Sequence, residues 1–172
     1  MRELTPVLTA GEIHLLVKRM AQQISDDYRG RELVLIAVLK GSFIFLADLV
    51  RQLTLPVKID FLQASSYGAD TRSSGSVRLV KDVGVDIRGK DVLLVEDIVD
   101  TGFTVNWLLD HLRSFQPRSL GVCVFIDKRE RREAQVPIAY AGHVTQEGFL
   151  VGYGLDYAEE YRHLPGIYHL SM

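Results

Sequence analysis

Residues 92–104 read Val-Leu-Leu-Val-Glu-Asp-Ile-Val-Asp-Thr-Gly-Phe-Thr. The run from Val92 to Val95 is apolar without alternation, which predicts a parallel strand covered on both faces. Two carboxylates follow this run, and Asp100 then leads into Thr-Gly-x-Thr at the expected start of a helix. We expect a strand, a loop and a helix, with the loop at the carboxyl end of the strand, where open α/β sheets bind ligands.

The residue types in this stretch favour a sugar phosphate as the ligand. Hydroxyls and close backbone approach beside helix-start amides suit a phosphate, and they come from Thr101, Gly102 and Thr104. Acceptors for ribose hydroxyls or a metal come from Glu96, Asp97 and Asp100. An ordinary N-capped helix would explain one such carboxylate. Three carboxylates beside Thr-Gly-x-Thr favour a binding site.

The stretch resembles the phosphoribosyl-diphosphate (PRPP) signature of type I phosphoribosyltransferases, in which two acidic residues precede Asp-Thr-Gly-x-Thr. The resemblance implies a single α/β domain, with a central, mostly parallel sheet flanked by helices. The core would span about 30–145, and a small hood would come from about 1–10 and 146–172. It also implies that the ribose and 5-phosphate of PRPP are bound by Glu96, Asp97, Asp100, Thr101, Gly102, Phe103 and Thr104. Phe103 stands where some relatives carry lysine.

Bulk properties agree with a single enzyme-sized domain. A chain of 172 residues, 47% of them hydrophobic, can bury one good core. Its net charge of -2 gives no bulk field for binding nucleic acid. The N-terminus lacks the apolar core of a signal peptide, and no apolar run approaches the ~20 residues that cross a bilayer. We expect a cytoplasmic protein that binds neither nucleic acid nor membrane, with Cys123 buried in a strand over 120–126.

A second strand, loop and helix precede the central one. Thr9 and Glu12 have capping-box spacing, which predicts a helix from about Ala10 to Ser25. An apolar strand over 33–39 is then followed by Lys-Gly-Ser and an apolar helix over 43–50. Alone, Lys-Gly-Ser would be a plain turn. In the 6-oxopurine members of the family a Leu-Lys-Gly turn holds pyrophosphate, often with a non-proline cis peptide before the lysine, so the resemblance implies pyrophosphate contacts from Lys40, Gly41 and Ser42.

A polar stretch interrupts the fold pattern after a probable strand over 57–62, near the edge of the sheet. Residues 63–76 offer almost nothing to bury, which is typical of a mobile loop or a floppy hairpin. Ser66 and Tyr67 match the pair by which this family's catalytic loop closes over its substrates. The resemblance therefore implies a lid over about 63–77.

The charged run over 127–133 follows the strand that holds Cys123. Lys128 stands at the carboxyl end of that strand, on the side of the ligand loops. The resemblance implies that its ammonium donates to the exocyclic oxygen of a purine. We expect the arginines at 129, 131 and 132 to be solvated surface residues without a role in the site. Trp107, in a helix expected to end near Phe115, is best explained by packing.

The segment from Phe149 to Tyr157 reads Phe-Leu-Val-Gly-Tyr-Gly-Leu-Asp-Tyr. It resembles the C-terminal segment of the 6-oxopurine phosphoribosyltransferases. The resemblance implies that Phe149 stacks on the purine and that Leu150 contacts its edge through the backbone. It further implies that Asp156 holds Mg²⁺ through water and that Arg162 contacts pyrophosphate.

Together these features imply a purine salvage enzyme that transfers the 5-phosphoribosyl group of PRPP to N9 of hypoxanthine or guanine. Asp100 would be the general base, and Mg²⁺ would bind near Glu96, Asp97 and Asp156. Two alternatives stay open. One is a phosphoribosyltransferase for xanthine or a pyrimidine, and the other is a non-catalytic, nucleotide-sensing regulator that binds RNA. The resemblance also implies a homodimer or homotetramer.

Overall fold

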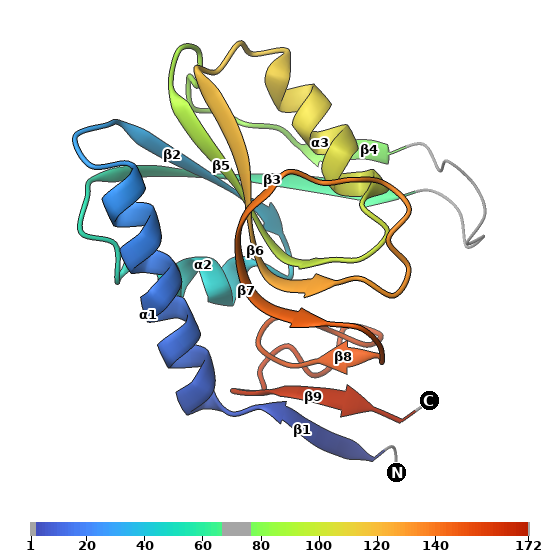
Figure 1. Ribbon diagram of the computed structural model, residues 1–172. Helices are drawn as coiled ribbons and strands as arrows, with labels where there is room; N and C mark the ends of the chain where they lie inside the picture. Colours follow the sequence, from blue (N-terminus) through green and yellow to red (C-terminus); the bar gives the residue numbers. More distant parts are fainter. Residues whose placement is uncertain (1–2, 67–76, 172) are drawn as a thin grey trace.

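The computed structural model describes residues 3–66 and 77–171, which form two sheets (Figure 1). In the larger sheet the strand order is β4-β3-β2-β5-β6-β7, and in the smaller it is β1-β9-β8. In chain order the elements are β1 (Leu4–Leu8), α1 (Ala10–Asp27), β2 (Leu33–Leu39), α2 (Phe43–Val50), β3 (Val57–Ser66), β4 (Val77–Lys81), β5 (Asp91–Val99), α3 (Phe103–Arg113), β6 (Ser119–Lys128), β7 (Ile138–Thr145), β8 (Leu150–Val151) and β9 (Ile167–Leu170).

The larger sheet has a helical layer on each face. Strands β3, β2, β5, β6 and β7 run parallel, and β4 is an antiparallel edge strand. Alternate residues of a strand face opposite sides. Leu93 and Val95 accordingly pack with α1 and α2, whereas Val92 and Leu94 pack with α3. This two-sided burial explains why β5 begins as an unbroken apolar run.

The smaller sheet joins the two ends of the chain, as Figure 1 shows. Strand β1 pairs antiparallel with β9, and β9 pairs with β8. Leu4 lies opposite Leu170, so the first and last strands lie side by side. The expected small unit built from terminal segments is therefore present.

Most predicted boundaries agree with the structure. Helix α1 has the predicted capping box between Thr9 and Glu12, although it continues to Asp27. Strand β5 continues to Val99, so the two carboxylates that were expected to end the strand lie within it. Trp107 is 36% exposed and stacks on His111, with ring centroids 5.7 Å apart, so packing against the core does not explain it.

The expected lid boundary at residue 63 is wrong. Residues 63–66 belong to β3 and pair with β4, with Gln63 opposite Lys81 and Ser66 opposite Val77. Antiparallel backbone pairing satisfies the amides of this polar stretch without any apolar side chains to bury. Residues 67–76, and with them Tyr67, lie outside the described residues.

No helix within the described ranges is both long and apolar enough to cross a membrane.

Candidate active site

Three neighbouring strands end at one edge of the larger sheet and bring the predicted site residues together. Strands β2, β5 and β6 are adjacent and parallel, so their carboxyl ends meet. Lys40 follows β2, Asp100 follows β5, and Lys128 is the last residue of β6. Because β2 connects onward to β3 on one side and β5 to β6 on the other, this is the point at which an open α/β sheet binds ligands.

The loop from Asp100 to α3 has the geometry of a phosphate cradle. Gly102 adopts φ 93°, a conformation that residues with a side chain avoid, and a Cβ there would lie 2.6 Å from the carbonyl oxygen of Ala134. Among the described residues no side chain caps α3, so its first amides are available to an anion. The carbonyl of Thr101 accepts hydrogen bonds from the amides of Glu133 and Ala134, each at 3.0 Å, which fixes the loop.

Glu96 and Asp97 occupy the last part of β5, and neither carboxylate forms an ion pair with a described residue. Glu96 is only 8% exposed, and burial together with the Asp97 charge raises its pKa well above the ordinary value. Burial likewise raises the pKa of Asp97 to about 6, although its carboxylate accepts a hydrogen bond from the Ile98 amide at 2.8 Å. Two adjacent carboxyls in this state favour a cation or ribose hydroxyl donors.

The turn after β2 contacts Asp97 directly. The Leu39–Lys40 peptide is cis, as the family resemblance suggested. A Cβ on Gly41 would overlap the Asp97 carboxylate, 2.7 Å from its carbon, so any larger residue would force that carboxylate to move. Ser42 is fully buried, and its hydroxyl donates to the Val38 carbonyl at 2.6 Å. In this conformation Lys40 is the exposed member of the turn.

The C-terminal segment adds an ion-pair network to this turn. A Cβ on Gly154 would overlap the carbonyl of Gly41, so glycine at position 154 allows the two backbones to approach closely. Arg162 donates to the Gly154 carbonyl at 2.7 Å and pairs with Asp156 at 3.1 Å. Glu159, which the sequence did not single out, pairs with Lys40 at 2.7 Å and with Arg162 at 3.3 Å. The two predicted pyrophosphate cations therefore share one carboxylate.

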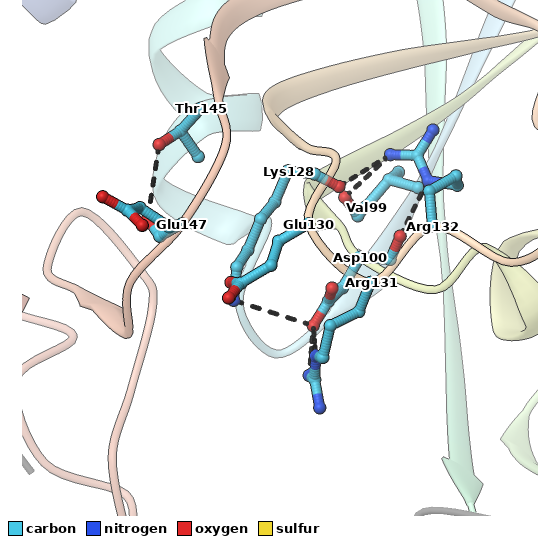
Figure 2. Close-up of polar contacts among 8 residues, drawn as sticks. All are labelled: Val99, Asp100, Lys128, Glu130, Arg131, Arg132, Thr145 and Glu147. Carbon is cyan, nitrogen blue, oxygen red and sulfur yellow. Dashed lines mark hydrogen bonds and ion pairs between the residues drawn. The ribbon is translucent and has the colours of Figure 1, made fainter.

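Asp100 follows β5 and lies among the cations Lys128, Arg131 and Arg132, as Figure 2 shows. Lys128, 8% exposed, places its ammonium 4.0 Å from Asp100 Oδ2 and 3.6 Å from Glu130. Arg131 Nε donates to the same oxygen at 3.1 Å, and its Nη2 also contacts that oxygen. Arg132 donates to the Asp100 backbone carbonyl at 2.7 Å.

The expectation that the arginines after Lys128 play no part in the site is wrong for two of them. Arg131 pairs with Asp100, and Arg132 bonds to the carbonyls of Val99, Asp100 and Lys128 and to the Asp127 carboxylate. The Arg129 side chain pairs, among the residues that the structure describes, only with Asp127. The sequence pattern could not show which of these arginines contact Asp100, because those contacts arise only where β6 ends beside β5.

Phe149 and Leu150, both predicted to bind the purine, differ in their exposure. Phe149 is 39% exposed, and its ring meets Tyr157 edge-on with centroids 5.6 Å apart. Leu150 is buried and pairs with His169 of β9, so its side chain is part of the core. Ser66 ends β3 at the same sheet edge.

The residues present fit a hard divalent cation that keeps most of its water. The candidate donors are all carboxylate oxygens, which Mg²⁺ prefers. Within the described parts of the chain, no three His, Cys, Asp or Glu side chains converge on one point. Asp156 already accepts from Arg162 and from the Glu159 amide. Substrate and water oxygens must therefore supply most of the coordination.

Comparisons with known proteins agree with this geometry. The family model of the phosphoribosyl transferase domain matches residues 5–158. The chain is 48% identical to a hypoxanthine-guanine phosphoribosyltransferase of Mycobacterium avium, over 92% of this chain and 81% of that protein. It is 44% identical to a hypoxanthine phosphoribosyltransferase of Salmonella typhimurium, over 92% and 90%. A solved hypoxanthine-guanine phosphoribosyltransferase from Bacillus anthracis superposes with a TM-score of 0.93 at 45% identity, covering 98% of this chain and 99% of that one.

The match covers the central sheet and the C-terminal segment as far as residue 158, so it includes the strand ends described above. The predicted fold and family are confirmed. The chain belongs to the phosphoribosyl transferase family.

Proposed function

We propose that this protein transfers the 5-phosphoribosyl group of PRPP to N9 of hypoxanthine or guanine, giving IMP or GMP and pyrophosphate. One observation carries the proposal. Asp100 both opens the phosphate cradle and lies 4.0 Å from the ammonium of Lys128, the donor expected for a 6-oxo group. A base at this position faces both halves of a two-substrate site. The names of the relatives support the same assignment.

PRPP is bound along the ends of β2 and β5. The amides at the start of α3 and the hydroxyls of Thr101 and Thr104 hold the 5-phosphate. Glu96 and Asp97 accept from the ribose hydroxyls, and their charge stabilises positive charge on the sugar. Lys40 and Arg162 hold the pyrophosphate end. These groups position the substrate and supply electrostatic stabilisation.

The transfer exchanges one bond at the ribose C1 for another. The bond from C1 to pyrophosphate breaks with its electron pair on oxygen, which leaves oxocarbenium character at C1, as in glycoside cleavage. N9 of the purine then forms the new bond, and the proton of its imidazole ring passes to Asp100. Lys128 holds the exocyclic oxygen, and Phe149 stacks on the ring.

Mg²⁺ is part of the proposal. It would bind near Glu96, Asp97 and Asp156, largely through water and substrate oxygens, where it neutralises charge on the departing pyrophosphate.

The proposal includes a cytoplasmic homo-oligomer of two or four copies. The oligomer follows from the family resemblance, and the exposed side chains of Leu15 in α1 (65%) and Phe43 in α2 (44%) are candidates for burial in its interface. Light scattering after size-exclusion chromatography distinguishes a dimer, a tetramer and a monomer.

The test is pyrophosphate release with PRPP, Mg²⁺ and one base at a time. Hypoxanthine and guanine should give product. If xanthine or uracil were the sole active base, the protein would be one of the other phosphoribosyltransferases. If no base led to pyrophosphate release, the nucleotide-sensing regulator would be the remaining alternative. RNA binding, which that regulator requires, is measured separately by filter retention.

A further inference from the structure

The Asp100 carboxylate has one oxygen held by cations and one left open. Oδ2 accepts from Arg131 and faces the Lys128 ammonium at 4.0 Å. Oδ1 is buried and has no hydrogen-bond partner among the described residues. A buried acceptor without a donor is unfavourable, and a catalytic role is one of the explanations for such a group. In the proposed reaction, a purine N–H is the donor that this oxygen lacks.

Arg131 is the cation that hydrogen-bonds to the Asp100 carboxylate. Its guanidinium directs Nε and Nη2 at Oδ2, whereas the Lys128 ammonium stays beyond hydrogen-bond distance. Among the described residues, the other charged groups at this place are Glu130, 3.6 Å from Lys128, Glu133, whose charge acts on Arg131, and Arg132, which is occupied by backbone carbonyls and Asp127. Without Arg131, Lys128 is the cation that remains within ion-pair distance of the Asp100 carboxylate in the described part of the chain (Figure 2).

We propose that Arg131 is a positioning residue that keeps Asp100 and Lys128 apart, so that the first can accept the purine proton and the second can bind the purine oxygen. The inference rests on the proposed function. A direct Asp100–Lys128 ion pair would occupy the base and the purine donor together. The planar fork of arginine suits this role, because it fixes the carboxylate as well as neutralising it.

The chain offers a matched control two residues away. Arg129 and Arg131 have nearly equal side-chain exposure, 55% and 56%, and each pairs with one carboxylate. The partner of Arg129 is Asp127, which keeps Arg132 at 2.6 Å when Arg129 is removed. Arg129→Ala therefore removes the same charge from the same loop without freeing Lys128.

The experiment compares Arg131→Ala, Arg131→Lys and Arg129→Ala with the wild type. Arg131→Ala should lower kcat about tenfold or more and raise the KM for hypoxanthine, while the Kd for PRPP from calorimetry stays within about twofold. Millimolar guanidinium chloride, at constant ionic strength, should restore part of the lost kcat. Arg131→Lys should be intermediate, and Arg129→Ala should resemble the wild type.

A double-mutant cycle separates positioning from folding. In an Asp100→Asn background, Arg131→Ala should have little further effect on kcat, because the carboxylate that it positions is gone. Wild-type kcat in Arg131→Ala would overturn the inference, as would a joint loss of kcat and PRPP affinity without guanidinium rescue. An inactive wild type would instead overturn the proposed function.

Discussion

Lys40 and Glu159, 119 residues apart in the chain, form an ion pair of 2.7 Å at the place where pyrophosphate is expected to bind. The other oxygen of Glu159 lies 3.3 Å from Arg162. The carboxylate thus bridges two cations, much as the oxygens of a diphosphate could. Its backbone adopts φ 67°, and the Asp156 carboxylate accepts from its amide at 3.0 Å, so the side chain is held in place.

Glu159→Gln should tighten pyrophosphate binding, because the incoming anion no longer competes with a carboxylate. Exposed ion pairs contribute little, so we expect only roughly a two- to fivefold lower Kd. Calorimetry with Mg²⁺ and pyrophosphate measures this change. Glu160→Gln removes the same charge one residue away and serves as the control. Weaker binding in Glu159→Gln would mean that Glu159 orients the two cations for the ligand.

Gly41→Ala should disrupt PRPP binding through Asp97. The new methyl group would overlap the Asp97 carboxylate, which must then leave its position. A displacement of about 1 Å at such a site can cost about 100-fold in rate, so we expect at least about a tenfold rise in the KM for PRPP. Gly11→Ala is the control, since a Cβ there meets only the Thr9 hydroxyl, at 4.0 Å. Normal PRPP kinetics in Gly41→Ala would show that Asp97 is not needed there.

Asp100→Asn should lower kcat by about 10²- to 10⁴-fold, the usual contribution of a general base. The amide keeps the size of the side chain, and the Thr101–Thr104 cradle is untouched, so the Kd for PRPP should change little. Stopped-flow turnover and calorimetry report the two quantities separately. Equal losses in both would remove Asp100 from the chemical step.

Titration of Asp97 should make the ligand-free protein less stable as the pH rises from about 4 to about 6. Burial raises the pKa of Asp97 from 3.8 to about 6. Between these values Asp97 binds more protons in the folded protein than in the unfolded chain, so its contribution to stability decreases as pH rises. Asp97→Asn should remove up to about 3 kcal/mol of this decrease in the free energy of unfolding, measured by urea unfolding at each pH. Asp110→Asn, at an exposed site on α3, should leave it unchanged, and an unchanged slope in Asp97→Asn would contradict the assignment.

The sequence was informative where local pattern and chemistry coincide. The apolar run before Glu96 predicted a doubly covered strand, and the capping box at Thr9 predicted the start of α1. The motif around Asp100 predicted a phosphate cradle, and the structure has an uncapped helix start with a left-handed Gly102 there.

The sequence could not predict contacts that depend on strands meeting in space. Arg131 lies in a charged run typical of a solvated surface, and only the adjacency of β5 and β6 brings it to Asp100. Glu159 reaches Lys40 because Gly154 packs on Gly41. The burial of Ser42 also depends on tertiary structure, since its hydroxyl bonds to a carbonyl of the preceding strand.

The central claim is that Asp100 and Lys128 complete a site for phosphoribosyl transfer to a 6-oxopurine. The most direct measurement follows IMP and pyrophosphate in the same reaction with PRPP, Mg²⁺ and hypoxanthine, with adenine in a parallel reaction. The account predicts equal amounts of IMP and pyrophosphate from hypoxanthine and little product from adenine. Pyrophosphate without nucleotide, or equal transfer to adenine, would contradict it.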